Sequence, residues 1–171
     1  MSDSGNPSAE AIINDIRPRT DLPIKYIKFD KDGYSLAEAR NRAVIEAQGE
    51  ILVFCDDRIK MEKNAVEAFV ETQTVPKVWQ WGIKDNFEKG FVENFSCVNR
   101  SDLIQFGMFN ERIDRYGGMT QEIRTRFEGV NNFLFEVNKK ALANSIRRAT
   151  SKSRRREDII KAKFTISKLY D

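Results

Sequence analysis

A capped helix that leads directly into an apolar strand restricts the possible folds more than any other part of the sequence. Ser35-Leu36-Ala37-Glu38 fits a capping box, in which the serine side chain accepts from the first helical turn and the glutamate reaches back. Apolar residues recur at helical spacing as far as Gly49, which favours a helix end. The run from Ile51 to Cys55 is continuously apolar and predicts a strand buried on both faces of a parallel sheet.

Helices and strands are expected to alternate along the rest of the chain. The patterns predict strands at residues 24–29, 51–55, 77–83, 90–98 and 132–137, and helices at residues 9–16, 35–49, 63–72, 101–106 and 120–128. This order indicates an α/β fold with a mostly parallel sheet flanked by helices. We divide the chain into a domain of residues 1–138 and a basic, mostly helical C-terminal extension of residues 139–171.

The chain contains no histidine, and this excludes several kinds of active site. A Ser-His-Asp or Cys-His triad, a histidine general base and an imidazole-bound zinc ion all require that residue. The two cysteines, Cys55 and Cys97, are too few for a four-thiolate zinc site or a disulfide scaffold. Any catalysis must therefore use carboxylates, hydroxyls, Lys or Arg, or a metal held by oxygen.

Positive charge is concentrated near the C-terminus, although the net charge of the chain is only +3. Residues 147–163 carry eight Lys or Arg and two acidic residues. A solvated or packed helix face is the first interpretation, an anionic membrane surface the second, and nucleic acid the last, because the segment has no interleaved aromatic residues. With no signal peptide and no apolar run of membrane-spanning length, we expect a cytoplasmic protein, with peripheral membrane association as the alternative.

Two adjacent carboxylates, Asp56 and Asp57, follow the most apolar strand. Open α/β sheets bind ligands at the carboxyl ends of their strands, and neighbouring carboxylates repel each other unless a cation or donors compensate. Mg²⁺ or Mn²⁺ carrying substrate phosphates would serve this purpose. The alternative, equally compatible with the spacing, is that Asp56-Asp57-Arg58 is a polar strand exit with a local ion pair.

Arg40 lies on the capped helix at the edge of its apolar face. An arginine in this position either extends to solvent or binds an anion. With Asn41 beside it, the helix would offer hydrogen-bond donors toward the same edge of the sheet as the aspartates.

These segments together resemble the family 2 glycosyltransferases with a GT-A fold. The resemblance covers roughly residues 2 to 130 and is carried by the order and spacing of several motifs. The matching segments are the Arg-Asn helix at residues 35–43, the turn and strand at residues 47–57, Gly107-Met108-Phe109-Asn110-Glu111-Arg112, Tyr116-Gly117-Gly118, and Ser2-Asp3-Ser4-Gly5-Asn6.

The resemblance implies transfer of a sugar from a nucleotide-sugar donor with inversion at the anomeric carbon. It implies Asp3 near the nucleotide base and donor-binding roles for Arg40, Asn41, Asp56, Asp57 and Arg58, with Mg²⁺ or Mn²⁺ at Asp57. A carboxylate would deprotonate the acceptor hydroxyl, and the acceptor would be lipid-linked or a polysaccharide.

The sequence departs from the family pattern at three places. The opening strand of the family has no counterpart, so a second copy or a partner chain is expected to complete the sheet. Arg58 replaces the last aspartate of the Asp-x-Asp motif, which suggests metal-independent donor binding. Met119 and Thr120 replace the Glu-Asp pair that holds the base.

A substitute base would have to be Glu122, Glu111 or Asp114, and Glu122 is the nearest candidate. The alternative is that Glu122 only contributes charge to a helix N-terminus. The competing interpretation of the whole chain is therefore a non-catalytic binding or assembly subunit that keeps the fold.

Overall fold

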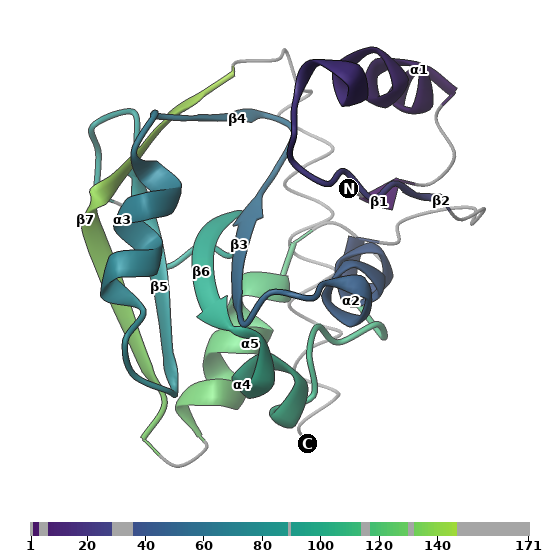
Figure 1. The fold of residues 1–171 in the computed structure, drawn as a ribbon. Helices are drawn as coiled ribbons and strands as arrows, with labels where there is room; N and C mark the ends of the chain where they lie inside the picture. The colour runs from purple at the N-terminus through teal and green to yellow at the C-terminus, as the bar shows by residue number, and fades with distance from the viewer. Residues whose placement is uncertain are drawn as a thin grey trace, which may run out of the picture.

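A five-stranded mixed sheet forms the centre of the molecule (Figure 1). The computed structural model describes residues 2–3, 7–28, 36–88, 90–113, 117–129 and 132–146. Across the sheet the strands are β3 (Ile51–Cys55), β6 (Phe95–Asn99), β5 (Val78–Lys84), β7 (Leu134–Ser145) and β4 (Ile59–Met61). The helices are α1 (Pro7–Ile16), α2 (Leu36–Glu46), α3 (Ala65–Thr72), α4 (Arg100–Gln105) and α5 (Met119–Glu128), with a 3-10 turn at Arg17–Arg19.

The α/β class predicted from the sequence is confirmed, but the expectation of a mostly parallel sheet is wrong. In the main sheet β5 and β7 are parallel, whereas the pairs β3–β6, β6–β5 and β7–β4 are antiparallel. The physical reason is the connection between β5 and β6. A parallel pair needs a long crossover, usually a helix, whereas only ten residues, 85–94, join these strands, and those that the structure describes form no helix.

Two short strands form a separate parallel pair. β1 (Ser2–Asp3) lies beside β2 (Ile27–Lys28), and α1 lies between them in the sequence. In the part of the chain that the structure describes, neither strand is hydrogen-bonded to the main sheet. β3 is therefore an edge strand of that sheet.

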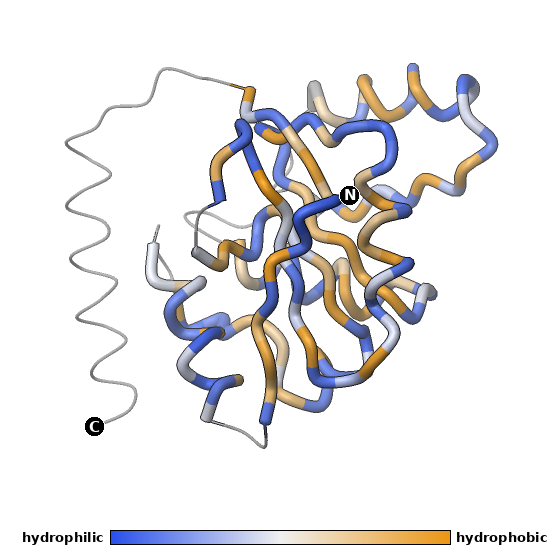
Figure 2. Tube along the Cα trace, turned by 90° about the vertical axis from the view of Figure 1, so that its left-hand side faces the viewer, coloured by the Kyte–Doolittle hydropathy of each residue, from blue (hydrophilic) through white to orange (hydrophobic). Residues whose placement is uncertain are grey.

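Both faces of the main sheet are covered, and β3 contributes to both. Leu52 points into a core shared with α2, α4 and α5, whereas Val53 packs against the core under α3. The strand predicted at residues 51–55 is present and contributes side chains to both cores, but only Leu52 is buried and its partner strand β6 is antiparallel. Figure 2 shows hydrophobic residues concentrated along the strands at the centre of the molecule.

Trp79 on β5 lies at the centre of the larger core and is fully buried. Aromatic rings surround it at centroid separations between 5.4 and 6.2 Å, from Phe54, Phe91, Phe109, Phe127 and Phe135. The indole N–H donates to Ser96 Oγ at 2.9 Å, so its one polar atom is satisfied. This cluster ties the sheet to α5 and to the loop before it.

The predicted helix over residues 139–145 is wrong, because β7 continues through it to Ser145. Ala141 and Ala143 are buried under α3 while the residues between and after them are exposed, which is the two-residue period of a strand. Pairing with β5 and β4 therefore overrides the helical preference of alanine. The proposed boundary between residues 138 and 139 falls inside this strand, and the basic segment at residues 147–171 lies outside the described residues.

The remaining helices lie close to their predicted positions, and β4 has no counterpart in the sequence prediction. Ser35, the expected cap of α2, lies outside the described residues. Within the described part of the chain, the helices are all too short or too polar to cross a membrane.

Candidate active site

Arg40 is held between two carboxylates in the interior of the protein. Its Nη2 donates to Asp56 Oδ1 and its Nη1 donates to Glu93 Oε1, each at 2.9 Å. The side chains of Arg40 and Glu93 are 8% and 10% exposed, whereas that of Asp56 is 30% exposed. The cluster therefore opens toward solvent at Asp56 and is closed at Glu93.

The loop before β6 brings Glu93 to the end of β3. The backbone N–H of Asp56 donates to the carbonyl oxygen of Asn94 at 3.1 Å, which extends the β3–β6 pairing by one residue. The carbonyl oxygen of Glu93 accepts from Ser96 Oγ at 2.8 Å, and Ser96 in turn accepts from Trp79. The position of Glu93 is thus fixed by the aromatic core beneath it.

The first turn of α5 completes the cluster. Thr120 Oγ1 donates a short hydrogen bond to Glu93 Oε2, and Met119 Sδ lies 3.2 Å from Arg40 Nη1. Gly118 precedes the helix at φ +82°, a conformation that favours glycine. Residues from α2, β3, the loop before β6 and α5 therefore meet at one place.

The pairing of Arg40 with Glu93 keeps both side chains ionised. Burial alone would lower the pKa of Arg40, but Glu93 and Asp56 raise it above its usual value. Burial alone would raise the pKa of Glu93, but the charge of Arg40 and the hydrogen bonds from Thr120 and Arg40 bring it below its usual value. One arginine faces two carboxylates, which leaves one uncompensated negative charge within the triad.

Asp57 and Arg58 lie on the exposed turn between β3 and β4. Arg58 Nε is 3.8 Å from Asp57 Oδ1, and their side chains are 46% and 62% exposed, respectively. A separation of this size at the surface is a weak ion pair. Breaking this pair to bring Arg58 toward a ligand would therefore cost little.

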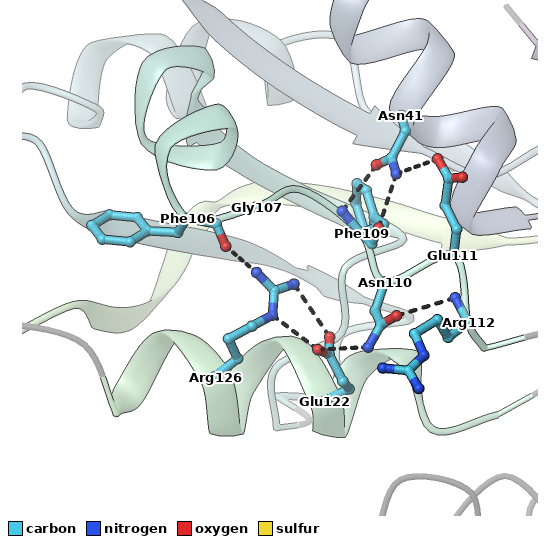
Figure 3. Close-up of a pocket in the computed structure, with 9 residues that line it drawn as sticks. All are labelled: Asn41, Phe106, Gly107, Phe109, Asn110, Glu111, Arg112, Glu122 and Arg126. Carbon is cyan, nitrogen blue, oxygen red and sulfur yellow. Dashed lines mark hydrogen bonds and ion pairs between the residues drawn. The ribbon is translucent and has the colours of Figure 1, made fainter. Parts of the chain in front are cut away.

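Asn41 binds a different segment from Arg40, its neighbour on α2. Its amide nitrogen donates to Phe109 O at 2.9 Å and to Glu111 Oε1 at 2.8 Å, and its oxygen accepts from the Phe109 N–H at 2.9 Å. These bonds fix the loop between α4 and α5 against α2 (Figure 3). The Arg40 guanidinium lies over the Phe109 ring, 5.2 Å from its centroid.

Glu122 is fully buried and paired with Arg126 at 2.8 Å, one turn along α5. Asn110 Nδ2 lies 3.3 Å from the same carboxylate, and Arg126 also donates to the carbonyl oxygens of Phe106 and Met108. Phe106, Asn110, Glu122 and Arg126 line a cavity of about 490 Å³. Figure 3 shows Glu122 bonded to Arg126 and to Asn110. The bonds from Arg126 to Phe106 and Met108, together with the bond from Asn110 to Glu122, join α5 to the loop that precedes it, so Glu122 has a structural role.

The remaining candidate residues from the sequence are Asp3, Asp114 and Glu111. Asp3 lies on β1 opposite Lys28, and its side chain is not described. Asp114 lies outside the described residues. Glu111 is exposed and accepts from Asn41.

The sequence profile described as Glycosyl transferase family 2 matches residues 1–135. The chain belongs to glycosyl transferase family 2. Solved structures agree with this assignment at the level of the fold. No functionally curated protein matches the chain with significant similarity.

Three solved structures illustrate the shared fold. A mannosyltransferase from Pyrobaculum calidifontis, solved with GDP-Man and Mn²⁺, is 18% identical with a TM-score of 0.74 and covers 99% of this chain and 54% of its own. GalNAc-T7, solved with UDP, GalNAc and Mn²⁺, is 10% identical with a TM-score of 0.70 over 86% of this chain and 37% of its own. TarS 1-349 from S. aureus, solved with UDP-GlcNAc, is 14% identical with a TM-score of 0.67 over 88% of this chain and 49% of its own. The chain thus spans between 37% and 54% of these proteins.

A metal ion held by Asp56 and Asp57 could take further ligands from substrate phosphates. Among the described residues, no group of three or more Asp, Glu or Cys side chains could hold a metal ion. Asp56 and Asp57 could each supply a carboxylate, although Asp56 Oδ1 already accepts from Arg40. Mg²⁺ is commonly held by one or two carboxylates with substrate phosphates, and this pair is compatible with that arrangement.

The residue that the sequence analysis missed is Glu93. It is one of three acidic residues in the loop at residues 85–94, 53 positions from Arg40, and no motif marks it. It bonds to Thr120, which occupies a position where the family pattern has a carboxylate. This family member therefore supplies a carboxylate to the start of α5 from another part of the chain.

Proposed function

We propose that this protein transfers a sugar from a nucleotide-sugar donor to an acceptor hydroxyl, with inversion at the anomeric carbon. The observation that carries the proposal is the buried Arg40–Asp56–Glu93 cluster, at the end of β3 and the start of α5 in a family 2 chain. Structural neighbours solved with UDP, UDP-GlcNAc and GDP-Man support a nucleotide-sugar as the donor.

The donor diphosphate would lie against the turn that carries Asp57 and Arg58. A guanidinium forms a planar fork that fits phosphate oxygens, so Arg58 would leave its weak pairing with Asp57 for the diphosphate. Asp57 would hold Mg²⁺ or Mn²⁺ if one is bound, and the cation would supply positive charge to the leaving diphosphate. Asp3 would lie near the nucleotide base.

Arg40 would act on the donor site from the interior of the protein, through Asp56. Both of its terminal nitrogens are engaged, so it orients Asp56 in the resting protein. Direct contact with the diphosphate, as expected from the sequence, would require Arg40 to leave one of the two carboxylates. Asn41 would act indirectly by fixing the loop at Phe109.

A non-catalytic donor-binding or assembly subunit is the second candidate. It is favoured by Met119 and Thr120 at the start of α5, and by the pairing of Glu122, the base expected from the sequence, with Arg126. Such a subunit would bind a nucleoside diphosphate but would release none from a nucleotide-sugar.

The acceptor and a partner chain are part of the same proposal. The acceptor would be lipid-linked or a polysaccharide, on the cytoplasmic side of a membrane. β3 is the edge of the main sheet as far as the structure describes it, so a second copy or a partner chain could pair with it. Nucleic acid is not an expected partner.

Isothermal titration of UDP and GDP, with Mn²⁺ and with EDTA, tests donor binding. We expect Asp57→Ala to weaken the preferred nucleotide by about tenfold, which is about 1.4 kcal/mol. Glu71→Ala, an exposed carboxylate on α3, is the matched control and should change affinity by less than about twofold. No binding of either nucleotide would overturn the proposal, and a strict Mn²⁺ requirement would overturn the suggestion that Arg58 replaces the metal.

Release of nucleoside diphosphate from UDP-GlcNAc, GDP-mannose and related sugars separates the two candidates. Hydrolysis that Asp57→Ala reduces and Glu71→Ala preserves supports the enzyme. Tight nucleotide binding without release from any donor supports the binding subunit.

A further inference from the structure

Thr120 and Glu93 form a hydroxyl–carboxylate pair at the N-terminus of α5. The Thr120 hydroxyl donates to Glu93 Oε2, while Glu93 Oε1 accepts from Arg40. Both carboxylate oxygens of Glu93 therefore have a defined partner. One of them, the Thr120 hydroxyl, carries a proton that can be transferred.

The two members of the pair differ in access to solvent. Glu93 is 8% exposed, and Arg40 and Met119 beside it are buried as well. Thr120 is only partly buried. A ligand at this edge of the sheet can thus reach the hydroxyl more readily than the carboxylate behind it.

Other carboxylates near α5 are less suited to take a proton from a ligand. Glu122 is fully buried in an ion pair with Arg126. Glu111 lies on the loop that Asn41 holds against α2, in contact with the amide of that residue.

We propose that Thr120 relays the acceptor proton to Glu93 during sugar transfer. The acceptor oxygen bonds to the anomeric carbon while the bond from that carbon to the diphosphate oxygen breaks, and its electron pair leaves with the diphosphate. The acceptor proton passes to Thr120 Oγ1 as the Thr120 proton passes to Glu93 Oε2, so that Glu93 ends neutral and Thr120 is unchanged. This relay rests on the proposed function, for which it names the proton acceptor.

Arg40 keeps the proton acceptor in the required state. Its charge and the Thr120 hydrogen bond lower the pKa of Glu93, so the carboxylate is ionised at neutral pH before the reaction. When Glu93 takes the proton, Arg40 retains Asp56 as its charged partner. The buried guanidinium therefore keeps an anionic partner before and after the transfer.

Two near-isosteric substitutions test the relay. Glu93→Gln removes the proton acceptor, and Thr120→Val removes the hydroxyl while leaving both ion pairs of Arg40 in place. Each should lower kcat for diphosphate release, with water as the acceptor, by about a hundredfold, within the range for general bases. Nucleotide affinity should change by less than about threefold, because the proposed contacts of the diphosphate are with Asp57 and Arg58.

A carboxylate moved to position 120 gives a stricter test. In the double variant Thr120→Asp/Glu93→Gln it would face the acceptor directly, and we expect it to regain at least about a tenth of the wild-type kcat. Thr120→Asp alone puts two carboxylates side by side, so the acidic limb of its pH–rate profile should move to higher pH. Assays are run well below the Tm of each variant, and Glu71→Ala is the control.

The outcomes separate the relay from the proposed function. Failure of the wild type to bind UDP or GDP overturns both. Binding without diphosphate release from any donor overturns the relay and leaves the donor site intact. Wild-type kcat in either single variant, or a folded, nucleotide-binding double variant without recovery, overturns the relay alone.

Discussion

The ionised state of Glu93 makes stability dependent on pH. Its pKa in the folded protein is lowered by Arg40 and Thr120, against the effect of burial. A depressed carboxyl pKa contributes stability above the pKa of the unfolded chain, and this contribution is lost as pH falls through the folded pKa. We therefore expect the Tm to decrease as the pH is lowered from about 5 toward 3. Thermal melts across this range provide the measurement.

Glu93→Gln should remove much of that acid sensitivity, because the group that titrates is gone. At pH 7 the variant should lose about 1–3 kcal/mol, the usual cost of removing a partner from a buried polar group. Glu71→Ala should keep the wild-type pH dependence. A parallel loss of Tm with pH in wild type and Glu93→Gln would contradict the assigned ionisation.

Individual site residues were predictable from the sequence where a local pattern marks them. The sequence predicted that Arg40 and Asp56 face the same edge of the sheet, and they meet at 2.9 Å. It could not predict Glu93, because the loop reaches the cluster only through the β5–β6–β3 pairing. Position along the chain makes Glu122 the candidate base, but position gives no information on its buried pairing with Arg126.

The pairing of β5 with β7 requires a glycine at residue 82. A Cβ added there would lie 2.6 Å from the carbonyl oxygen of Ala141 and would also overlap the Phe95 ring. The β5–β7 register shifts between Gly82 and Ile83, so the two backbones approach closely at this point. Gly82→Ala should destabilise the protein by about 1–3 kcal/mol, as overpacking of a core does.

Chemical denaturation measures this effect, with Gly49→Ala as the control. At Gly49 the nearest atom to an added Cβ is Ile51 O at 3.5 Å, an ordinary contact. A change within about 0.5 kcal/mol is expected there. Equal stabilities of the two variants would show that the sheet relaxes around residue 82.

Helices and strands were predictable in type where periodicity was strong, and much less so in their pairing. The five helices and the strand at residues 51–55 follow from apolar spacing. Strand direction depends on which connections cross the sheet, and local pattern does not report this. Residues 139–145 read as helix because alanine and lysine favour it, whereas pairing on both sides makes them a strand.

The two edge strands of the main sheet differ in how apolar they are. Among the described residues β4 forms one edge and β3 the other, and β3 is the more apolar strand, with side chains in both cores. An apolar edge strand offers unpaired backbone groups to another chain. As part of the proposed function, we expect a second copy to pair with β3.

Two measurements on the intact chain test this association. Light scattering should give about twice the monomer mass of 19.8 kDa at high protein concentration. Hydrogen exchange should slow at Ile51–Cys55 as concentration rises, because pairing gives the outward-facing amides of an edge strand a partner. The matched internal control is Ile59–Met61 at the opposite edge, which should exchange at the same rate throughout. A rise in mass with no added protection at β3 would place the contact elsewhere, and a constant monomer mass would rule out self-association at this edge.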